Sequence, residues 1–376
     1  MKIIIDDKIP YIKGALEPVA EVVYLPGDKT TAKVVKHADA IITRTRTLCN
    51  KKLLAGSSVR FIATATIGFD HIDTEYCEKV GIVWTNAPGC NSKSVEQYVA
   101  SALMVMALKK GITLAGKTIG IVGVGNVGSK VARICEIFGL RVLLNDPPRA
   151  REEGKAAFVD LDEILEEADI ITMHVPLNMY GFDKTYHLAD ETFFARAKKK
   201  PIFINSCRGE VADNAALKNA ISSNKVSGVI IDCWENEPVI DTELLEIIDL
   251  GTPHIAGYSK DGKANGTSMS VQEVSRFFGL GLDNWVCEHV ELPASTLIEI
   301  DGQDKTEQQI FSEAILATYD IRNDDQSLRT TVRSFEKLRG DYPVRREFPV
   351  FEIKASNMAP ATIEKLLAIG FKVCVD

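Results

Sequence analysis

Three side chains suited to acid–base chemistry or anion binding occur in the middle of the sequence, each after an apolar run. Arg208 lies in SCRG, Glu237 in WENEP and His254 in TPHIAG. Histidine is a suitable base near neutral pH. A carboxylate on its second ring nitrogen would fix its tautomer, and a forked guanidinium can hold a carboxylate and its neighbouring carbonyl. The set favours removal of a hydroxyl proton beside a carboxylate.

Each of the three also has a structural explanation. His254 could be a satisfied structural group, Arg208 could pair with any nearby acid, and Glu237 could be a solvated loop charge. All three, however, follow strand ends of one predicted parallel sheet, on one edge. A shared site requires this geometry, and ligands of open α/β sheets bind there.

A glycine motif precedes these residues and predicts a dinucleotide site. Gly123-x-Gly125-x-x-Gly128 stands between an apolar strand and a helical pattern. The first glycine allows the tight turn, the second lets the backbone approach a pyrophosphate, and the third permits close helix–strand packing. The N–H groups at the helix start, with Asn126 and Val127 in the turn, then face the phosphates. The alternative is an ordinary glycine-rich turn without a ligand.

Asp146, at the end of the next strand, decides between cofactors. Its carboxylate can accept both ribose hydroxyls and would repel a 2′-phosphate, so NAD is expected rather than NADP. Arg149 and Arg151 lie close by and could instead host that phosphate.

The elements that position these residues alternate between strand and helix, which predicts parallel sheets covered by helices. A long helix over residues 92–110 separates two such α/β units. The later part of the chain differs: it carries a helix near 307–318, a charged loop around 322–329 and a strand–helix–strand pattern. Strands are expected at residues 2–5, 22–25, 40–43, 60–65, 82–85, 119–122, 141–145, 170–175, 201–205, 229–232 and 254–257, the last closing the second sheet, and at 350–353 and 372–375. Helices are expected at residues 74–80, 161–168, 215–222, 268–278 and 361–367.

The amino-acid composition limits the classes of function that the protein can have. The 376 residues carry a net charge of −8 and 45% hydrophobic residues, as in soluble globular proteins with more than one domain. No basic run suggests nucleic acid as a partner. The eight cysteines show no CxxC or metal-like pairing with histidine, so no metal is expected. With no signal peptide and no apolar stretch long enough to span a bilayer, a cytoplasmic location is expected.

Taken together, the motifs resemble those of the D-2-hydroxyacid dehydrogenase family. The resemblance covers nearly all of residues 1–281, and Arg, Glu and His follow the glycine motif in the family's order. It rests on the glycine motif with Asp146, HVPL at 174–177, NSCRG at 205–209, DCWENEP at 232–238 and HIAG at 254–257. It implies NAD-dependent oxidation of a small, phosphorylated 2-hydroxy acid.

The resemblance also implies roles and domains. Arg208, Glu237 and His254 are the expected catalytic residues, with His254 as the proton carrier. The expected fold class is α/β: a flavodoxin-like substrate or lid domain (1–92 plus about 258–281), a Rossmann NAD-binding domain (93–257) and a small C-terminal α+β dimerisation domain (282–376), which makes a homodimer. The expected cofactor contacts are Gly123, Gly125, Asn126, Val127, Gly128, Asp146, Val175, Cys207, Asp232 and Gly257, and the expected substrate contacts are Thr45, Thr66 and Tyr258.

Several alternatives stay open at this stage. A substrate phosphate needs cations on an acidic protein, and Arg44 and Arg46 are candidates. Arg345 and Arg346 could reach the cleft of a partner subunit, or could simply be solvated. The C-terminal part could regulate activity. The chain could also act on another hydroxy acid of the same family's range, or could be an NAD-sensing protein that binds partners.

Overall fold

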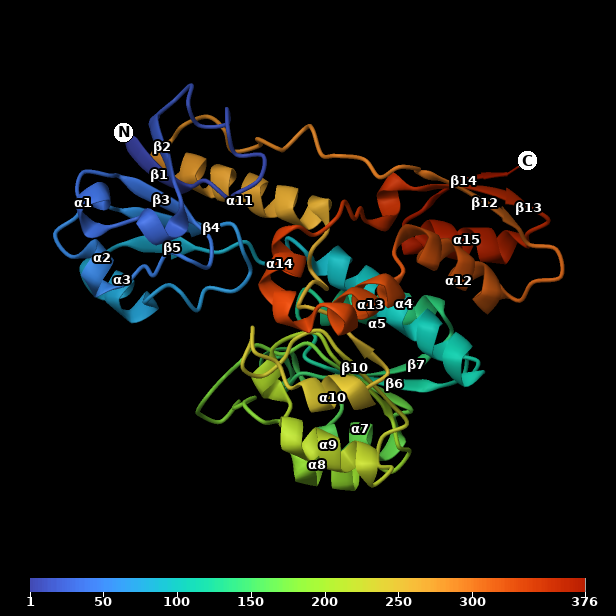
Figure 1. The fold of residues 1–376 in the computed structure, drawn as a ribbon. Helices are drawn as coiled ribbons and strands as arrows, with labels where there is room; N and C mark the ends of the chain where they lie inside the picture. Colours follow the sequence, from blue (N-terminus) through green and yellow to red (C-terminus); the bar gives the residue numbers. More distant parts are fainter. Residues whose placement is uncertain (376) are drawn as a thin grey trace. The chain divides into compact units, whose positions relative to one another are not determined.

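The computed structural model describes residues 1–375, which divide into two compact units (Figure 1). The first comprises Met1–Asn91 and Ser259–Glu291, and the second comprises Ser92–Tyr258 and Leu292–Asp376. Each is built on parallel strands, as the alternating strand and helix patterns predict. Among the described residues, no helix is long and apolar enough to cross a membrane.

The first unit contains a five-stranded parallel sheet in the order β2-β1-β3-β4-β5, the flavodoxin-like order. Alternate residues of each strand face opposite cores: Ile3 and Ile5 pack with α11, and Ile4 packs with α1 to α3. The strands are β1 (Lys2–Asp6), β2 (Glu21–Leu25), β3 (Ala40–Thr43), β4 (Phe61–Thr64) and β5 (Val83–Thr85). The helices are α1 (Ala32–Val35), α2 (Lys51–Leu54), α3 (Thr74–Val80) and α11 (Lys260–Phe278), with a 3-10 turn at Gly27–Lys29.

The second unit contains a six-stranded parallel sheet in the order β11-β10-β9-β8-β6-β7. The chain order reverses beside β6, which is the switch point where nucleotides bind in such sheets. The strands are β6 (Thr118–Val122), β7 (Arg141–Asn145), β8 (Ile170–Met173), β9 (Ile202–Asn205), β10 (Gly228–Ile231) and β11 (Leu250–Gly251). Helices α7 (Leu161–Glu167), α8 (Glu191–Arg196), α9 (Asn214–Ser222) and α10 (Thr242–Ile247) cover one face (Figure 1).

The other face of this sheet is covered by α4 (Ser92–Lys110) and α5 (Gly128–Ile137). Most of α4 is buried on all sides, because the C-terminal segment packs over it and joins the same hydrophobic core. Phe311 and Phe351 of that segment belong to this core together with Leu103 of α4. A short helix, α6 (Pro147–Glu153), follows β7, and 3-10 turns occur at Lys155–Ala157 and Gly209–Val211.

The C-terminal segment forms a three-stranded parallel sheet, β12-β13-β14, with helices against one face. Exposed and buried residues alternate along β13, so the other face of the sheet is open. The strands are β12 (Leu297–Asp301), β13 (Glu352–Ser356) and β14 (Lys372–Val375). The helices are α12 (Glu307–Thr318), α13 (Ile321–Thr330), α14 (Phe335–Gly340) and α15 (Pro360–Ile369), with 3-10 turns at Val332–Ser334 and Phe348–Val350.

The predicted secondary structure differs from the observed one in several places, and helices α6, α8, α10 and α14 were not predicted. Residues 254–257 are not a strand: β11 closes the sheet by pairing Leu250 with Ile230. The expected charged loop at 322–329 is helix α13, β12 was not expected, and α11 begins at Lys260 rather than 268. Gly262 and Gly266 lower the helix propensity of that first turn and a half, yet a Cβ on either would press against Asn91 or Ala65. The predicted domain boundaries and roles stay predictions.

Candidate active site

The glycine motif forms the turn between β6 and α5. Gly123 has φ of +90°, and a Cβ there would lie 2.6 Å from the carbonyl oxygen of His174. A Cβ on Gly128 would lie 2.0 Å from the oxygen of Gly123, whereas a Cβ on Gly125 would meet nothing within 4 Å. Two glycines are therefore required by the fold, and Gly125 keeps an exposed stretch of backbone open, as a pyrophosphate contact needs.

Asp146 stands beside this turn. Its carboxylate accepts hydrogen bonds from the backbone N–H of Val124 at 2.8 Å and of Arg149 at 3.1 Å, which caps α6. The Arg149 guanidinium is held by two hydrogen bonds to Glu153, at 2.6 and 2.8 Å. Arg151 pairs with Asp183. Because both arginines face acids, the site fits the ribose hydroxyls of NAD better than a 2′-phosphate.

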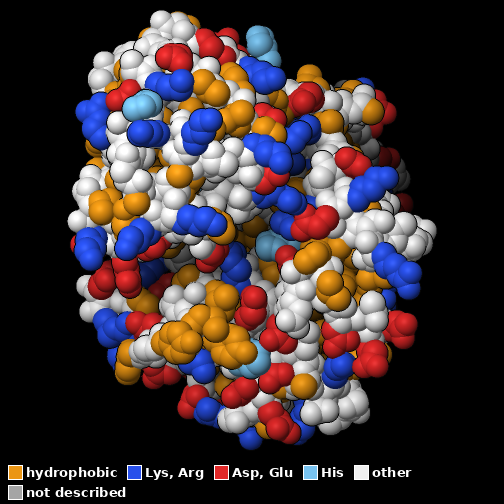
Figure 2. Space-filling model, turned by 60° about the vertical axis from the view of Figure 1, so that its left-hand side comes forward, with side chains coloured by type: hydrophobic (Ala, Val, Ile, Leu, Met, Phe, Trp, Pro, Cys, Tyr) orange, Lys and Arg blue, Asp and Glu red, His pale blue; other side chains and the backbone are white. Residues whose placement is uncertain are grey.

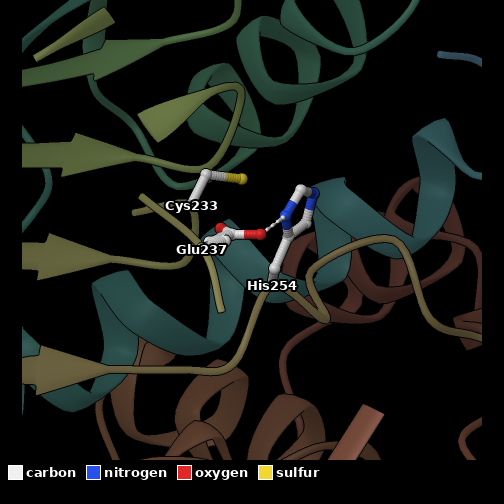
Figure 3. A group of neighbouring side chains, drawn as sticks. All are labelled: Cys233, Glu237 and His254. Carbon is white, nitrogen blue, oxygen red and sulfur yellow. Dashed lines mark hydrogen bonds and ion pairs between the residues drawn. The ribbon is translucent and has the colours of Figure 1, made fainter. Parts of the chain in front are cut away.

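His254 and Glu237 form the centre of the site (Figure 3). Nδ1 of His254 lies 2.7 Å from Oε2 of Glu237, and Oε1 of Glu237 accepts the backbone N–H of Trp234 at 2.8 Å. The second ring nitrogen, Nε2, takes no part in this contact. The pair can receive and release a proton, as the sequence predicts for a base fixed by a carboxylate.

Asp232 holds the loop that carries His254. Its buried carboxylate accepts the hydroxyl of Thr252 at 2.6 Å and the N–H groups of Ile255 and Ala256 at 2.8 and 2.9 Å. His254 adopts the left-handed conformation, with φ of 55°, and its own N–H donates to the Asp232 carbonyl at 2.9 Å. Burial raises the pKa of the Asp232 carboxyl, while His254 and these hydrogen bonds oppose the rise. Its predicted contact with NAD stays a prediction.

Arg208 follows β9, and its neighbour Gly209 lies against the backbone of Trp234, in the segment that carries Glu237. Asn205 Nδ2 donates to the Arg208 carbonyl at 2.9 Å, and Arg208 Nη1 donates to the Cys207 carbonyl at 2.8 Å. The next residue, Gly209, packs so closely that a Cβ would lie 2.0 Å from the Trp234 backbone. This close packing joins the β9 and β10 loops, as expected for residues that share one site.

Val175 and Cys207 lie together at the carboxyl ends of β8 and β9. The Cys207 thiol is hydrogen-bonded to the Val175 backbone, and burial raises its pKa to about 11, with Arg208 among the groups that lower it. The thiol therefore stays protonated and uncharged at neutral pH. Gly257 is half-buried beside Tyr258. Cofactor contacts at these positions remain predictions.

Cys233 is the third member of the group drawn in Figure 3. One ligand atom each from Cys233, Glu237 and His254 lies within 4.8 Å of the others, a spacing that a metal ion could use. Burial and the charges of Asp232 and Glu237 raise the pKa of the Cys233 thiol well above its ordinary value. Because Glu237 and His254 already hydrogen-bond to each other at 2.7 Å, the group is explained as a proton-carrying pair beside a buried thiol.

The C-terminal segment contributes side chains that the sequence interpretation missed. The Tyr258 ring packs edge-on against Tyr342 with centroids 5.8 Å apart, and the Arg339 guanidinium lies 5.6 Å from the Tyr258 centroid. Their separation of more than 80 residues along the chain left no local signal. Tyr258, an expected substrate contact, is therefore supported by the C-terminal segment of its own chain.

Arg345 and Arg346 are buried, so both expectations for them, a solvated surface or a partner's cleft, are wrong. Arg345 donates to the carbonyl oxygens of Ser94 at 2.6 Å and of Ile255 and Ala256 at 3.3 Å. Its guanidinium also covers the Tyr319 ring at 3.7 Å. These hydrogen bonds hold the backbone that follows His254.

Thr45 and Thr66 belong to the first unit, where they follow the neighbouring strands β3 and β4. Thr45 is exposed, and the Thr66 hydroxyl donates to the Gly68 carbonyl at 2.9 Å. Burial, with the nearby charges of Arg44 and Lys260, lowers the pKa of Lys263 to about 8. Lys260 and Lys263 thus lie near Arg44, one of the two cations, Arg44 and Arg46, that the sequence suggested for the phosphate. Elsewhere, Figure 2 shows cationic and anionic side chains intermixed over the visible face.

Two family models match the chain. One, described as D-isomer specific 2-hydroxyacid dehydrogenase, NAD binding domain, matches residues 92–256, and one described as a domain of unknown function (DUF3410) matches residues 291–370. A solved D-lactate dehydrogenase from Aquifex aeolicus, complexed with NAD and lactic acid, superposes with a TM-score of 0.61 at 27% identity and covers 75% of this chain and 97% of its own. The predicted α/β fold, NAD as cofactor and NAD-dependent oxidoreductase activity are confirmed.

Curated relatives match over almost the whole chain. The erythronate-4-phosphate dehydrogenase of Bacteroides thetaiotaomicron is 53% identical over 94% of this chain and 99% of its own, and that of Porphyromonas gingivalis is 42% identical over 96% and 98%. At this identity and coverage, the chain belongs to the erythronate-4-phosphate dehydrogenase family, within the D-2-hydroxyacid dehydrogenases.

Proposed function

We propose that this enzyme oxidises 4-phospho-D-erythronate at C2 with NAD, giving (R)-3-hydroxy-2-oxo-4-phosphooxybutanoate, a step in pyridoxal 5′-phosphate biosynthesis. The observation that carries the proposal is the 2.7 Å contact between His254 Nδ1 and Glu237. It provides a base for a hydroxyl proton in a chain whose full-length relatives are named for this substrate.

His254 takes the C2 hydroxyl proton through Nε2, and Glu237 stabilises the imidazolium that forms. NAD, when bound, accepts the hydride that leaves C2. Arg208 holds the substrate carboxylate with its forked donors and stabilises the negative charge on the forming 2-oxo group. In the reverse direction, protonated His254 is the acid. Thr45, Thr66 and Tyr258 contact the substrate.

The cofactor contacts follow from the glycine turn. Gly123, Gly125, Asn126, Val127 and Gly128 present backbone N–H groups to the pyrophosphate. The open space around Gly125 supports this role. Asp146 accepts the ribose hydroxyls, and the remaining contacts are assigned to Val175, Cys207, Asp232 and Gly257.

The domain roles and the assembly are further parts of this proposal. Residues 1–92 with about 258–281 form the substrate or lid domain, 93–257 the NAD-binding domain, and 282–376 a domain that makes a homodimer. Exposed Leu297, Leu367 and Val375 and the open face of the C-terminal sheet support an interface there. Light scattering on the purified protein tests the dimer. We also propose a cytoplasmic location, which is consistent with the eight free cysteines. Cell fractionation would test this location.

The experiment that tests the reaction is NADH formation, followed by absorbance, with hydrazine present to trap the 2-oxo product. The substrates are 4-phospho-D-erythronate, 3-phospho-D-glycerate and D-lactate. We expect a clear preference for the erythronate in kcat/KM. Preference for the glycerate would move the enzyme to a different hydroxy acid, and inactivity on all three with NAD still bound would favour an NAD-sensing role.

A further inference from the structure

Arg339 of α14 lies beside two residues assigned to the active site. Its guanidinium carbon is 5.6 Å from the centre of the Tyr258 ring, and it is hydrogen-bonded to the Tyr258 side chain. Glu237 is close enough to act on its charge. Arg339 is therefore a cation beside Tyr258 and within electrostatic range of Glu237, and it comes from the segment whose family model is described as a domain of unknown function.

The hydrogen-bonding capacity of Arg339 is only partly used. Its Nε is buried and has no hydrogen-bond partner in the described structure. Its ion pair with Glu336, from Nη1, is 3.4 Å long and involves a half-exposed carboxylate, so it is weak. Burial alone would lower the pKa of Arg339, but Tyr258 and Glu237 raise it above its ordinary value. The group carries a positive charge at every working pH.

A purely structural role accounts for only part of this arrangement. Arg339 covers the rings of Tyr258 and Phe335, the latter at 5.9 Å, and such cation–π contacts use the faces of the guanidinium. They do not use the edge that carries the Nε–H donor. A buried donor without an acceptor costs free energy unless a ligand supplies one. The edge of a guanidinium matches two oxygens of a carboxylate or phosphate.

We propose that Arg339 binds the phosphate group of the substrate, so that the C-terminal segment supplies a specificity-determining residue to the active site of its own chain. The inference rests on the proposed function, in which Arg208 already holds the substrate carboxylate and the phosphate dianion requires a further cation. Tyr258, which touches both Arg339 and the substrate in this proposal, keeps the guanidinium oriented.

The test compares Arg339→Met and Arg339→Lys with Arg333→Met, a matched control that removes an exposed arginine from the same segment. Each is assayed with 4-phospho-D-erythronate and with D-erythronate, which lacks the phosphate. We expect Arg339→Met to raise KM for the phosphorylated substrate about 10- to 100-fold, the scale of lost hydrogen bonds to a charged group. Values of kcat, and kcat/KM for D-erythronate, should change less than about threefold, and Arg339→Lys should be intermediate.

Equal losses on both substrates, or an unchanged KM for the phosphorylated one, would overturn the proposal. Calorimetric titration of the NAD-bound protein with inorganic phosphate gives a second, independent result: binding should weaken in Arg339→Met and not in Arg333→Met. If Arg339→Met does not fold, the lysine variant decides by the same two comparisons. Inactivity of the unsubstituted enzyme on 4-phospho-D-erythronate would count against the proposed function, and the phosphate titration would still decide the role of Arg339.

Discussion

Glu237 contacts both His254 and the backbone of Trp234, with one carboxylate oxygen for each, at 2.7 and 2.8 Å. The contact with Trp234 fixes the carboxylate, and the fixed carboxylate in turn fixes the imidazole. A base held in this way needs little reorganisation when it takes a proton.

Replacing Glu237 by Gln keeps the hydrogen-bonding shape and removes the charge. The imidazolium that forms when His254 takes the substrate proton then loses its charged partner on Nδ1. The plateau of kcat/KM for oxidation should therefore fall, and the pH profile should change. An unchanged profile would leave Glu237 without its assigned role.

His254→Ala removes the proton carrier. Turnover should fall about 100-fold or more, the usual scale for a general acid–base group. Binding of NADH, measured by fluorescence, should stay within a few-fold because the glycine turn is untouched. A near-normal kcat would exclude His254 from the mechanism.

Gly125→Ala should weaken NAD binding, whereas Gly128→Ala should lower the stability of the fold. Gly125 has open space around a Cβ, so its variant should fold normally and raise KM for NAD about tenfold or more by obstructing a hydrogen bond to the pyrophosphate. A Cβ on Gly128 would meet backbone at 2.0 Å, so its variant should lose about 1–3 kcal/mol or more of unfolding free energy. Denaturant unfolding and NAD kinetics on both variants separate the two effects, and identical behaviour would contradict the prediction.

Arg345→Met should destabilise the protein and loosen the His254 loop. It removes the donor for the carbonyl oxygens of Ser94 and Ala256. The free energy of unfolding should fall by about 3 kcal/mol, the scale of hydrogen bonds to a charged group. Arg322→Met is the control, because Arg322 is exposed and pairs with Asp320, and such pairs contribute about 0–1 kcal/mol. Urea unfolding of both variants checks this; equal midpoints would show that Arg345 does not support the loop.

The His174 side chain should make the free energy of unfolding depend on pH in the acidic range. Burial lowers its pKa from 6.5 to about 3. Between these values the unfolded chain binds a proton that the folded chain does not, so the free energy of unfolding falls as pH drops below 6.5. Between about pH 7 and about pH 5, the free energy of unfolding of the His174→Gln variant should therefore fall less than that of the unsubstituted protein. The exposed His289→Gln should behave like the unsubstituted protein in the same urea titrations; if His174→Gln does so too, His174 makes no such contribution.

The strands of both large sheets could be predicted because each is a short apolar run, and most have buried residues at every or every second position. The order of Arg208, Glu237 and His254 after successive runs then placed them at one edge. Helix α13 was missed because its sequence, IRNDDQSLRT, is strongly polar and buries only Ile321 and Leu328. Its other residues act through specific contacts, such as Asp325 with the N–H of Gly251 at 2.7 Å, which leave no periodic signal.

The part of the site that the sequence did not predict, the contact of Arg339 with Tyr258, was missed for the same reason: it leaves no periodic signal. The approach of Arg339 to Tyr258 depends on how the C-terminal segment packs on α4, and side-chain pairs distant in sequence produce no local pattern. His254 was expected in a strand because its neighbours Ile255 and Ala256 are apolar. The structure places it in a loop in the left-handed conformation, since Asp232 supplies enough hydrogen bonds to hold that backbone.

The core that α4 shares with Phe311 and Phe351 means that the segment after residue 291 is not an independent module. The two family models match residues 92–256 and 291–370, and the hydrophobic core is continuous between these two parts. Removing the segment after residue 291 would expose the apolar side chains of α4 to water, so this segment and Ser92–Tyr258 should unfold together.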